Sequence, residues 1–265
     1  MSGFQKMWRW STAGFFSYLS WFVVNILLLL LFPILTVCYR LGARRWVRTV
    51  VVTALRAYFL HILPVFGLYR IDKQSDTGAL RAIRRGLVVV NHTSWLDALI
   101  ILALVPNVRP LVSTRYGRVP LVSAAMQWLG CIFIDRRDRH SIAVAIEAIR
   151  ESLKASLPVA VFPEGTRYPI GQLGPFQEVF FSLAVEEEGV IEPVLLCLDI
   201  PFLGPGAENF LTPRPANLQI RKLSPITKDK KEKGKDLAFR TRRIMRKALL
   251  ASANGNRSRE RALDT

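Results

Sequence analysis

The side chains best suited to chemistry lie between Asn91 and Asp97, where the sequence reads Asn-His-Thr-Ser-Trp-Leu-Asp. A short apolar run, Leu87 to Val90, precedes this motif and predicts a buried strand directly before it. An imidazole titrates near neutral pH. A carboxylate bonded to one of its nitrogens would fix the tautomer and leave the other nitrogen as a general base. His92 and Asp97 are the candidates for this pair.

The geometry of the pair depends on where the following helix begins. Ser94 and Asp97 have the spacing of a capping box, which predicts Ser94 as the N-cap and Asp97 in the first turn. Two helical residues five apart would point about 140° apart, but a turn between strand and helix can fold the His92 ring back toward the carboxylate. The alternative is that Asp97 only caps the helix and His92 is a turn residue without a chemical role.

A second stretch suited to chemistry ends another predicted strand and reads Phe-Pro-Glu-Gly-Thr-Arg over residues 162–167. Gly165 would let backbone amides approach a ligand, Thr166 offers a hydroxyl, and Arg167 carries a planar fork suited to phosphate. The alternative is a turn that happens to carry charges.

The elements that must position these side chains are short strands alternating with helices. Apolar runs and helical spacing predict strands at Gly86–Val90, Cys131–Ile134, Leu157–Phe162 and Val194–Leu198, and helices at Ser94–Leu104 and Ser141–Leu153. This alternation indicates an α/β fold, with a central mixed sheet flanked by helices. Ligands of such sheets bind at the carboxyl ends of the strands, so His92, Arg136 and the loop 164–167 are expected to converge there.

The first 70 residues are expected to form membrane-anchoring helices. Residues 10–39 hold no charged side chain, and about 20 apolar residues of helix are enough to cross a hydrocarbon core. Pro33 is expected to kink or end this helix, and the arginines after it predict a cytoplasmic body by the positive-inside rule. Residues 46–68, which mix Arg48 and Arg56 with apolar side chains, are predicted to lie in the membrane interface. For residues 10–39, the alternatives are a segment that enters the membrane and returns at Pro33, with both ends cytoplasmic, and a buried core helix.

Composition favours an anionic membrane over nucleic acid as the partner. Lys and Arg number 37 against 20 Asp and Glu, a net charge of +17, while 51% of the residues are hydrophobic. This excess needs a polyanionic neighbour, but no nucleic-acid recognition motif accompanies it. The basic segment 226–265, with an amphipathic helix at Leu237–Leu250, is expected to bind anionic lipid, and the alternative is a solvated tail. Three distant cysteines indicate a reducing compartment, with neither a disulfide framework nor a zinc site.

Together these stretches resemble the glycerolipid acyltransferase family typified by bacterial 1-acylglycerol-3-phosphate acyltransferases. The resemblance covers about residues 85–200. It rests on a histidine and an aspartate separated by four residues, a Gly-x-x-Phe-Ile-Asp-Arg block at 130–136, the block at 162–167, and a proline before a strand at Pro193.

The resemblance implies direct transfer of an acyl group from a thioester, coenzyme A or acyl carrier protein, to a lysophospholipid hydroxyl. The first expectation is 1-acylglycerol-3-phosphate as acceptor, giving phosphatidic acid. His92 would take the hydroxyl proton and Asp97 would orient it, with Ser94 as an N-cap and not a nucleophile. The acceptor-binding positions correspond to Arg136, Glu164, Gly165, Thr166 and Arg167. No cofactor or metal is implied, and the acyltransferase domain, 71–225, is expected on the cytoplasmic face of the inner membrane.

Two departures from the family pattern leave the acceptor open. Arg115 stands where the family commonly has lysine and is a further substrate-binding candidate, while Phe176-Gln-Glu-Val179 replaces the usual Phe-Lys-x-Gly. A lyso-amino-acid lipid or another hydroxylated lipid is therefore an alternative acceptor. A lipid hydrolase or transacylase using the same base is the nearest alternative enzyme, and a non-catalytic lipid-binding scaffold is a more remote one.

Overall fold

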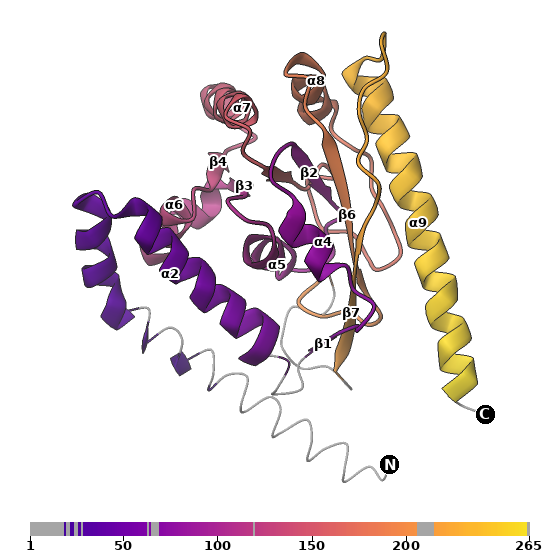
Figure 1. The fold of residues 1–265 in the computed structure, drawn as a ribbon, viewed down its shortest axis with the longest axis horizontal. Helices are drawn as coiled ribbons and strands as arrows, with labels where there is room; N and C mark the ends of the chain where they lie inside the picture. The colour runs from indigo at the N-terminus through magenta and orange to yellow at the C-terminus, as the bar shows by residue number, and fades with distance from the viewer. Residues whose placement is uncertain are drawn as a thin grey trace.

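A mixed sheet forms the centre of the computed structural model, which describes residues 19, 22–23, 26–27, 29–62, 64, 69–118, 120–205 and 215–263. The order of its seven described strands is β1-β7-β6-β2-β5-β3-β4 (Figure 1). Neighbouring strands are parallel except for β6 and β7, which are antiparallel. The strands are β1 (Tyr69–Ile71), β2 (Leu87–Val90), β3 (Arg109–Ser113), β4 (Ile132–Ile134), β5 (Val159–Val161), β6 (Ile191–Leu198) and β7 (Ala216–Lys222). The predicted α/β fold with a mixed sheet is confirmed.

The central strands are apolar on both sides, so both faces of the sheet must be covered. All four side chains of β2 are fully buried. Val88 and Val90 belong to one hydrophobic core and Leu87 and Val89 to another, which is the alternation expected of a strand. The four predicted strands correspond to β2, β4, β5 and β6, and each is an apolar run of this kind.

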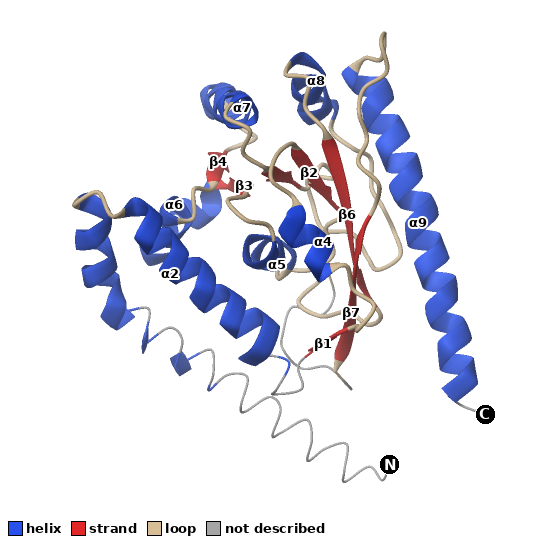
Figure 2. Cartoon of the chain, viewed as in Figure 1, coloured by secondary structure: helices blue, strands red, loops and turns tan. Residues whose placement is uncertain are grey.

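Helices cover the sheet from two sides (Figure 2). The first core includes side chains of α2 (Arg44–Ala57), α4 (Thr77–Ala82), α5 (Asp97–Leu104) and α6 (Pro120–Trp128). The second core includes side chains of α7 (Arg139–Lys154), α8 (Glu178–Glu186) and α9 (Gly234–Leu263). Two short helices of other types, η1 (Tyr58–Ile62) and η2 (Thr114–Arg118), complete the described elements.

About half of the predicted membrane segment, 10–39, lies outside the described residues. Residues 29–40 are helical, and the helix runs on through Pro33 instead of ending there. Among the described residues, no helix combines the length and the apolar character required to span a membrane.

Helix α2 packs onto the domain, and Arg48 and Arg56, which were expected in the membrane interface, contact the protein instead. Val47 and Val51 are buried in the first core. The guanidinium groups of Arg48 and Arg56 donate to backbone carbonyl oxygens of the domain, those of Val108 and Ala103, over 2.8 Å each. These two arginines therefore fasten α2 to the ends of the neighbouring elements.

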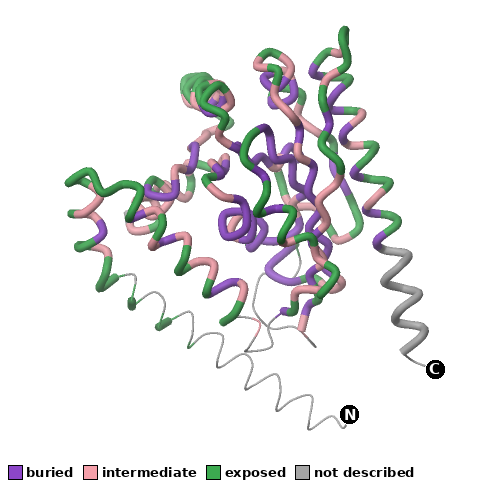
Figure 3. The backbone as a smooth tube through the Cα atoms, in the orientation of Figure 1, coloured by how far each residue is buried: buried purple, intermediate pink, exposed green. Residues whose placement is uncertain are grey.

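The C-terminal helix α9 is part of the domain, which corrects the prediction of a separate basic tail at 226–265. Its side chains Leu237, Met245 and Leu249 are buried in the second core. Figure 3 shows buried positions recurring along the part of α9 whose burial is described. The predicted amphipathic helix exists, but its apolar side faces the sheet and α8.

Candidate active site

The carboxyl end of β2 is tied to its neighbour β6 by a side chain. Asn91, which is 1% exposed, donates its amide to the carbonyl oxygen of Leu196 over 3.0 Å and accepts the N–H of the same residue over 2.8 Å. This pair replaces the backbone ladder just beyond the last residue of β2. The chain that follows therefore leaves the sheet from a fixed point.

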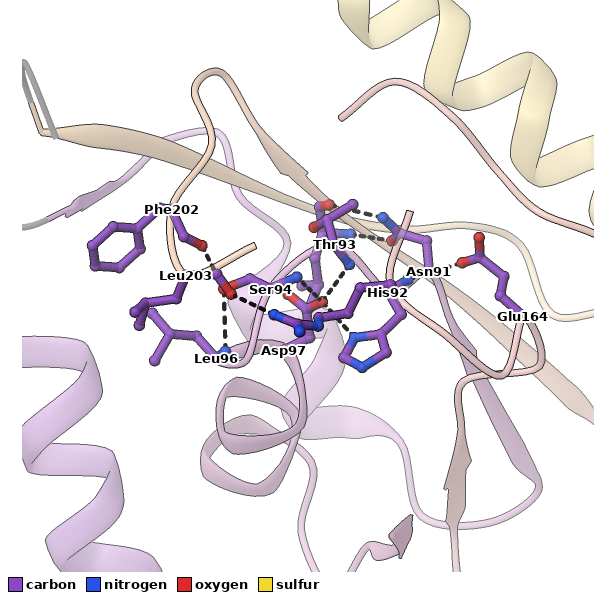
Figure 4. A network of polar contacts seen from close by, with 11 residues as sticks. Asn91, His92, Thr93, Ser94, Leu96, Asp97, Glu164, Phe202 and Leu203 are labelled. Carbon is purple, nitrogen blue, oxygen red and sulfur yellow. Dashed lines mark hydrogen bonds and ion pairs between the residues drawn. The ribbon is translucent and has the colours of Figure 1, made fainter. Parts of the chain in front are cut away.

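The next residue, His92, is held by Asp97 as the sequence predicted. Its Nδ1 lies 2.9 Å from the Oδ2 of Asp97, and that oxygen also accepts the backbone N–H groups of Thr93 and Ser94 over 2.7 and 2.8 Å. An ionised carboxylate can only accept hydrogen bonds, and this one already accepts two N–H groups. The ring nitrogen that faces it must therefore be a donor, which places the proton of the ring on Nδ1. Figure 4 shows the second ring nitrogen turned away from Asp97.

The helix begins three residues later than predicted, at Asp97 instead of Ser94. One half of the capping box is present, because Asp97 accepts the Ser94 N–H. The Ser94 hydroxyl donates to the Phe202 carbonyl oxygen over 2.8 Å and accepts the Leu96 N–H over 3.2 Å. Ser94 is 1% exposed, and these contacts make it a structural residue and not a nucleophile.

Glu164 holds the backbone of His92 from the opposite side. Its Oε1 accepts the His92 N–H over 2.9 Å, and its Oε2 accepts the Gly174 N–H over 2.7 Å. Burial raises the pKa of Glu164, and these two hydrogen bonds oppose that rise. Both oxygens are thus occupied by the protein, so these contacts favour a positioning role for Glu164 over the predicted contact with an acceptor.

The loop that follows Glu164 is fastened at two more points, neither of which was predicted. The N–H of Tyr168 donates to the His92 carbonyl oxygen over 2.8 Å. Arg242 of α9 donates to the carbonyl oxygens of Gly174 and Leu173 over 2.5 and 2.8 Å. A chain of hydrogen bonds therefore links the C-terminal helix to the histidine through Gly174 and Glu164.

Gly165 and Arg136 meet at the same edge of the sheet. Arg136 donates through Nη1 to the carbonyl oxygen of Gly165. Gly165 has φ +76°, and a Cβ there would collide with Arg136 and with Nε2 of Gln177. Glycine is favoured at this position because the backbone is left-handed, a conformation that other residues rarely adopt.

The remaining predicted cations lie around two aromatic rings. The guanidinium carbon of Arg167 lies 4.6 Å from the centroid of the Trp95 ring, a distance at which cation and ring attract. Trp95 packs edge-on against Tyr116 of η2, with ring centroids 5.4 Å apart. Burial raises the pKa of Tyr116, while the charges of Arg167 and the exposed Arg115 lower it, so both arginines act on this ring.

The described residues thus bring most of the predicted site together. His92, Asp97, Glu164 and Gly165 share one hydrogen-bonded framework with Arg136, and Arg167 lies beside it on Trp95. Thr166 is exposed and no hydrogen bond of its side chain is resolved. Among these described residues, no group of three or more His, Cys, Asp or Glu side chains has a metal-binding arrangement.

The arrangement is that of an α/β domain with a histidine–aspartate pair at the end of a strand and arginines nearby. The sequence profile of the Acyltransferase family matches residues 73–197. This match covers most of the stretch whose motifs resemble glycerolipid acyltransferases.

Curated proteins that resemble this chain share one enzyme name. The 1-acyl-sn-glycerol-3-phosphate acyltransferase of Helicobacter pylori is 33% identical over 123 residues, which cover 46% of this chain and 49% of the relative. The alpha enzyme of that name from Mus musculus is 33% identical over 143 residues, covering 53% and 50%. The chain spans about half the length of the curated relatives it matches.

A solved structure shares the fold. The crystal structure of the 1-acyl-sn-glycerophosphate acyltransferase PlsC from Thermotoga maritima superposes with a TM-score of 0.63 at 21% identity. The match covers 86% of this chain and 96% of that one. The likeness therefore extends beyond the acyltransferase motifs to the elements around them.

Proposed function

We propose that this protein is a membrane-bound acyltransferase that moves a fatty acyl group from a thioester to the hydroxyl of a lysophospholipid. The preferred acceptor in this proposal is 1-acylglycerol-3-phosphate, which gives phosphatidic acid. The observation that carries the proposal is the hydrogen bond between His92 and Asp97 at the end of β2. Relatives of this domain are named 1-acyl-sn-glycerol-3-phosphate acyltransferases, which supports the choice of acceptor.

In the proposed reaction, Nε2 of His92 takes the proton of the acceptor hydroxyl as its oxygen attacks the thioester carbonyl carbon. The carbon–sulfur bond of the tetrahedral intermediate then breaks, and the thiolate that leaves takes the proton from the imidazolium. Asp97 stabilises the imidazolium through Nδ1. No covalent acyl-enzyme is required, because the thioester is already activated. The buried hydroxyl of Ser94, bonded to Phe202, supports this direct route.

Arg167 is the proposed anchor for the acceptor phosphate. Its guanidinium carbon lies 4.6 Å from the centroid of the Trp95 ring and its Nη1 donates to the Leu203 carbonyl oxygen over 3.4 Å; a planar guanidinium fork held in this way matches the geometry of a phosphate. Trp95 is only three residues from His92 and 41% exposed. An acceptor bound at Arg167 therefore lies close to the base.

Gln177, which stands where the family's Phe-Lys-x-Gly pattern has lysine, favours a second class of acceptor. Gln177 carries its neutral amide up to Gly165, and Glu178 begins α8. Residue 177 thus adds no charge to that of Arg136 beside Gly165, and the loss of one cation weakens phosphate binding. A lyso-amino-acid lipid, whose headgroup carries less negative charge, is the alternative substrate, with the same base and the same donor.

Membrane attachment is part of the proposal, with the catalytic domain on the cytoplasmic face of the inner membrane. Apolar side chains of the N-terminal helices are largely exposed: Leu29, Leu30, Leu31, Ile34, Val37, Leu41 and Trp46. Arg40, Arg44 and Arg45 are exposed beside them. Apolar side chains bordered by arginines are typical of a surface that inserts among anionic lipid headgroups.

The experiment is a transfer assay on the full-length protein in lipid vesicles, with acyl-CoA and acyl carrier protein donors crossed against a panel of lysolipids. We expect product only where both a thioester and a lysolipid are present. Product from the 1-acylglycerol-3-phosphate arm supports the preferred acceptor, and product from the amino-acid lipid arm alone supports the alternative. Product formed without any thioester would indicate hydrolysis or transacylation and contradict the proposal.

A further inference from the structure

The phenyl ring of Phe162 lies against the imidazole of the candidate base. The centroids of the Phe162 and His92 rings are 4.4 Å apart, and the two ring planes differ by 33°. Rings this close and this nearly parallel meet by their faces, in the offset arrangement that aromatic pairs favour. One side of the imidazole is therefore in contact with a phenyl group, while its Nδ1 is bonded to Asp97.

The register of two neighbouring strands brings these rings together. β2 and β5 are parallel, with Val88 opposite Ala160, and both of these side chains belong to the first core. Side chains two residues apart along a strand point to the same face. Phe162 lies two residues beyond Ala160 and packs against the first core, and His92 lies four residues beyond Val88. The same face carries α5, which begins at Asp97, so ring, base and carboxylate share one side of the sheet.

The phenyl ring adds a restraint that the hydrogen bond to Asp97 does not supply. One hydrogen bond fixes the position of Nδ1 but leaves the imidazole free to tilt about that contact. Tilting moves Nε2, and proton transfer requires Nε2 to lie about 2.6–3.2 Å from the acceptor hydroxyl. Contact with Phe162 limits the tilt. A phenyl group has neither a donor nor an acceptor, so it restrains the imidazole without competing for Nε2.

The loop that begins at Phe162 also holds the backbone of the histidine. Glu164 accepts the His92 N–H, and the N–H of Tyr168 donates to the His92 carbonyl oxygen. The side chain of His92 is still 23% exposed, so part of it stays accessible to a substrate. Loop 162–168 therefore restrains the candidate base at its backbone and at its ring without covering it.

We propose that Phe162 is a positioning residue that fixes the plane of the His92 imidazole and thereby directs Nε2 toward the acceptor hydroxyl. The inference rests on the proposed acyltransferase function and adds a residue that acts on its base. Phe162 takes no part in proton transfer and acts only through His92.

The first test is steady-state transfer by full-length variants in lipid vesicles, with a donor and an acceptor that give product in the assay above. Phe162→Leu keeps an apolar side chain but loses the ring, whereas Phe162→Tyr keeps the ring. We expect kcat of Phe162→Leu to fall about three- to tenfold, as for the loss of one aromatic contact. Both KM values should stay within about twofold of wild type, and Phe162→Tyr should keep kcat within the same range.

Phe181→Leu is the matched control, because it removes one ring of another stacked pair. Phe181 is fully buried in the second core, and its ring centroid lies 5.8 Å from that of Phe176. This variant loses packing on the far side of the sheet from His92 and should keep the wild-type kcat. Equal falls in kcat in Phe162→Leu and Phe181→Leu would overturn the proposal. So would a Phe162→Tyr as impaired as Phe162→Leu, or a rise in KM with unchanged kcat.

Nuclear magnetic resonance tests the ring contact without turnover. The chain has three histidines, so isotope-labelled histidine in the full-length protein in nanodiscs, compared with His92→Ala, identifies the His92 signals. A stacked phenyl ring shifts imidazole protons upfield. The His92 ring protons should therefore move downfield in Phe162→Leu and stay in place in Phe162→Tyr and Phe181→Leu. Unmoved signals in Phe162→Leu overturn the proposal. If the signals move as expected but the wild type transfers no acyl group, the proposed function fails and the restraint on the ring stands.

Discussion

Glu164 accepts the backbone N–H of His92 through Oε1 over 2.9 Å, across 72 residues of sequence. The ring of the same histidine lies 2.9 Å from Asp97, so one buried carboxylate fixes its backbone and another fixes its side chain. Both carboxylates also act electrostatically at this point, since the charge of His92 lowers the pKa of Glu164 and that of Asp97 raises it. The position of the candidate base therefore depends on the folded domain and not on the motif alone.

Replacing the carboxylate that orients the ring should remove most of the activity. Oδ2 of Asp97 now accepts hydrogen bonds from three donors. In Asp97→Asn a neutral amide takes its place, and a neutral amide cannot stabilise an imidazolium by its charge. We expect kcat to fall about 10²–10⁴-fold, the usual contribution of an oriented general base. Steady-state kinetics with saturating donor and acceptor measure this, and a kcat within about twofold of wild type would show that Asp97 only caps the helix.

Removing the proposed phosphate anchor should change acceptor binding. Arg167→Ala loses the guanidinium that stacks on Trp95, and a hydrogen bond to a charged group contributes about 1.5–3 kcal/mol. We expect the acceptor KM to rise about tenfold or more with the donor KM nearly unchanged. Initial rates over a matrix of both substrates separate the two constants, and equal rises in both would contradict the assignment.

Arg242 should act on catalysis through the loop that it fastens. Arg242→Ala removes the donors to Gly174 and Leu173, which support Glu164 and through it His92. We expect kcat to fall about five- to tenfold, as for the loss of one or two hydrogen bonds. Arg243→Ala is the matched control, because Arg243 is the exposed neighbour on the same helix, and it should keep wild-type kcat.

A double-mutant cycle distinguishes this coupling from a general loss of stability. Glu164→Gln places an amide nitrogen where one carboxylate oxygen now accepts an N–H, so it breaks the same chain of contacts. The effects of Arg242→Ala and Glu164→Gln on kcat should therefore be clearly less than multiplicative. Multiplicative effects would mean that Arg242 does not act through Glu164.

The pKa of Glu164 predicts a pH dependence of stability. Burial raises this pKa above its ordinary value of 4.5, so in the range between the two values the folded protein binds more protons than the unfolded chain. The contribution of Glu164 to the free energy of unfolding therefore falls as pH rises through that range. Glu164→Gln cannot titrate. The free energy of unfolding of wild type minus that of the variant should thus decrease as the pH rises above the ordinary carboxyl value of 4.5. Urea denaturation at several pH values measures it, and a flat or rising difference contradicts the assignment.

The sequence could predict elements whose signal is local. The four predicted strands are continuous apolar runs, as β2 shows, and the His92–Asp97 contact follows from a turn between strand and helix. Strand β7 was not predicted, although Ala216, Leu218 and Ile220 alternate inward. An alternation count would have found it.

Other features depend on tertiary packing and leave no local signal. The contact of Arg242 with Gly174 joins residues 68 apart, and an arginine on a basic helix looks like any other in the sequence. The same applies to Arg48 and Arg56, whose side chains reach backbone carbonyls across 60 and 47 residues. Excess positive charge predicted lipid contact for these residues, whereas packing gives them partners inside the protein.

The most direct test of the account is single-turnover acyl transfer by His92→Ala in vesicles, with folding verified by thermal unfolding. We predict a rate of the chemical step about 10²–10⁴-fold below wild type, with donor and acceptor binding retained. A folded variant that transfers the acyl group at nearly the wild-type rate would show that His92 is not the base.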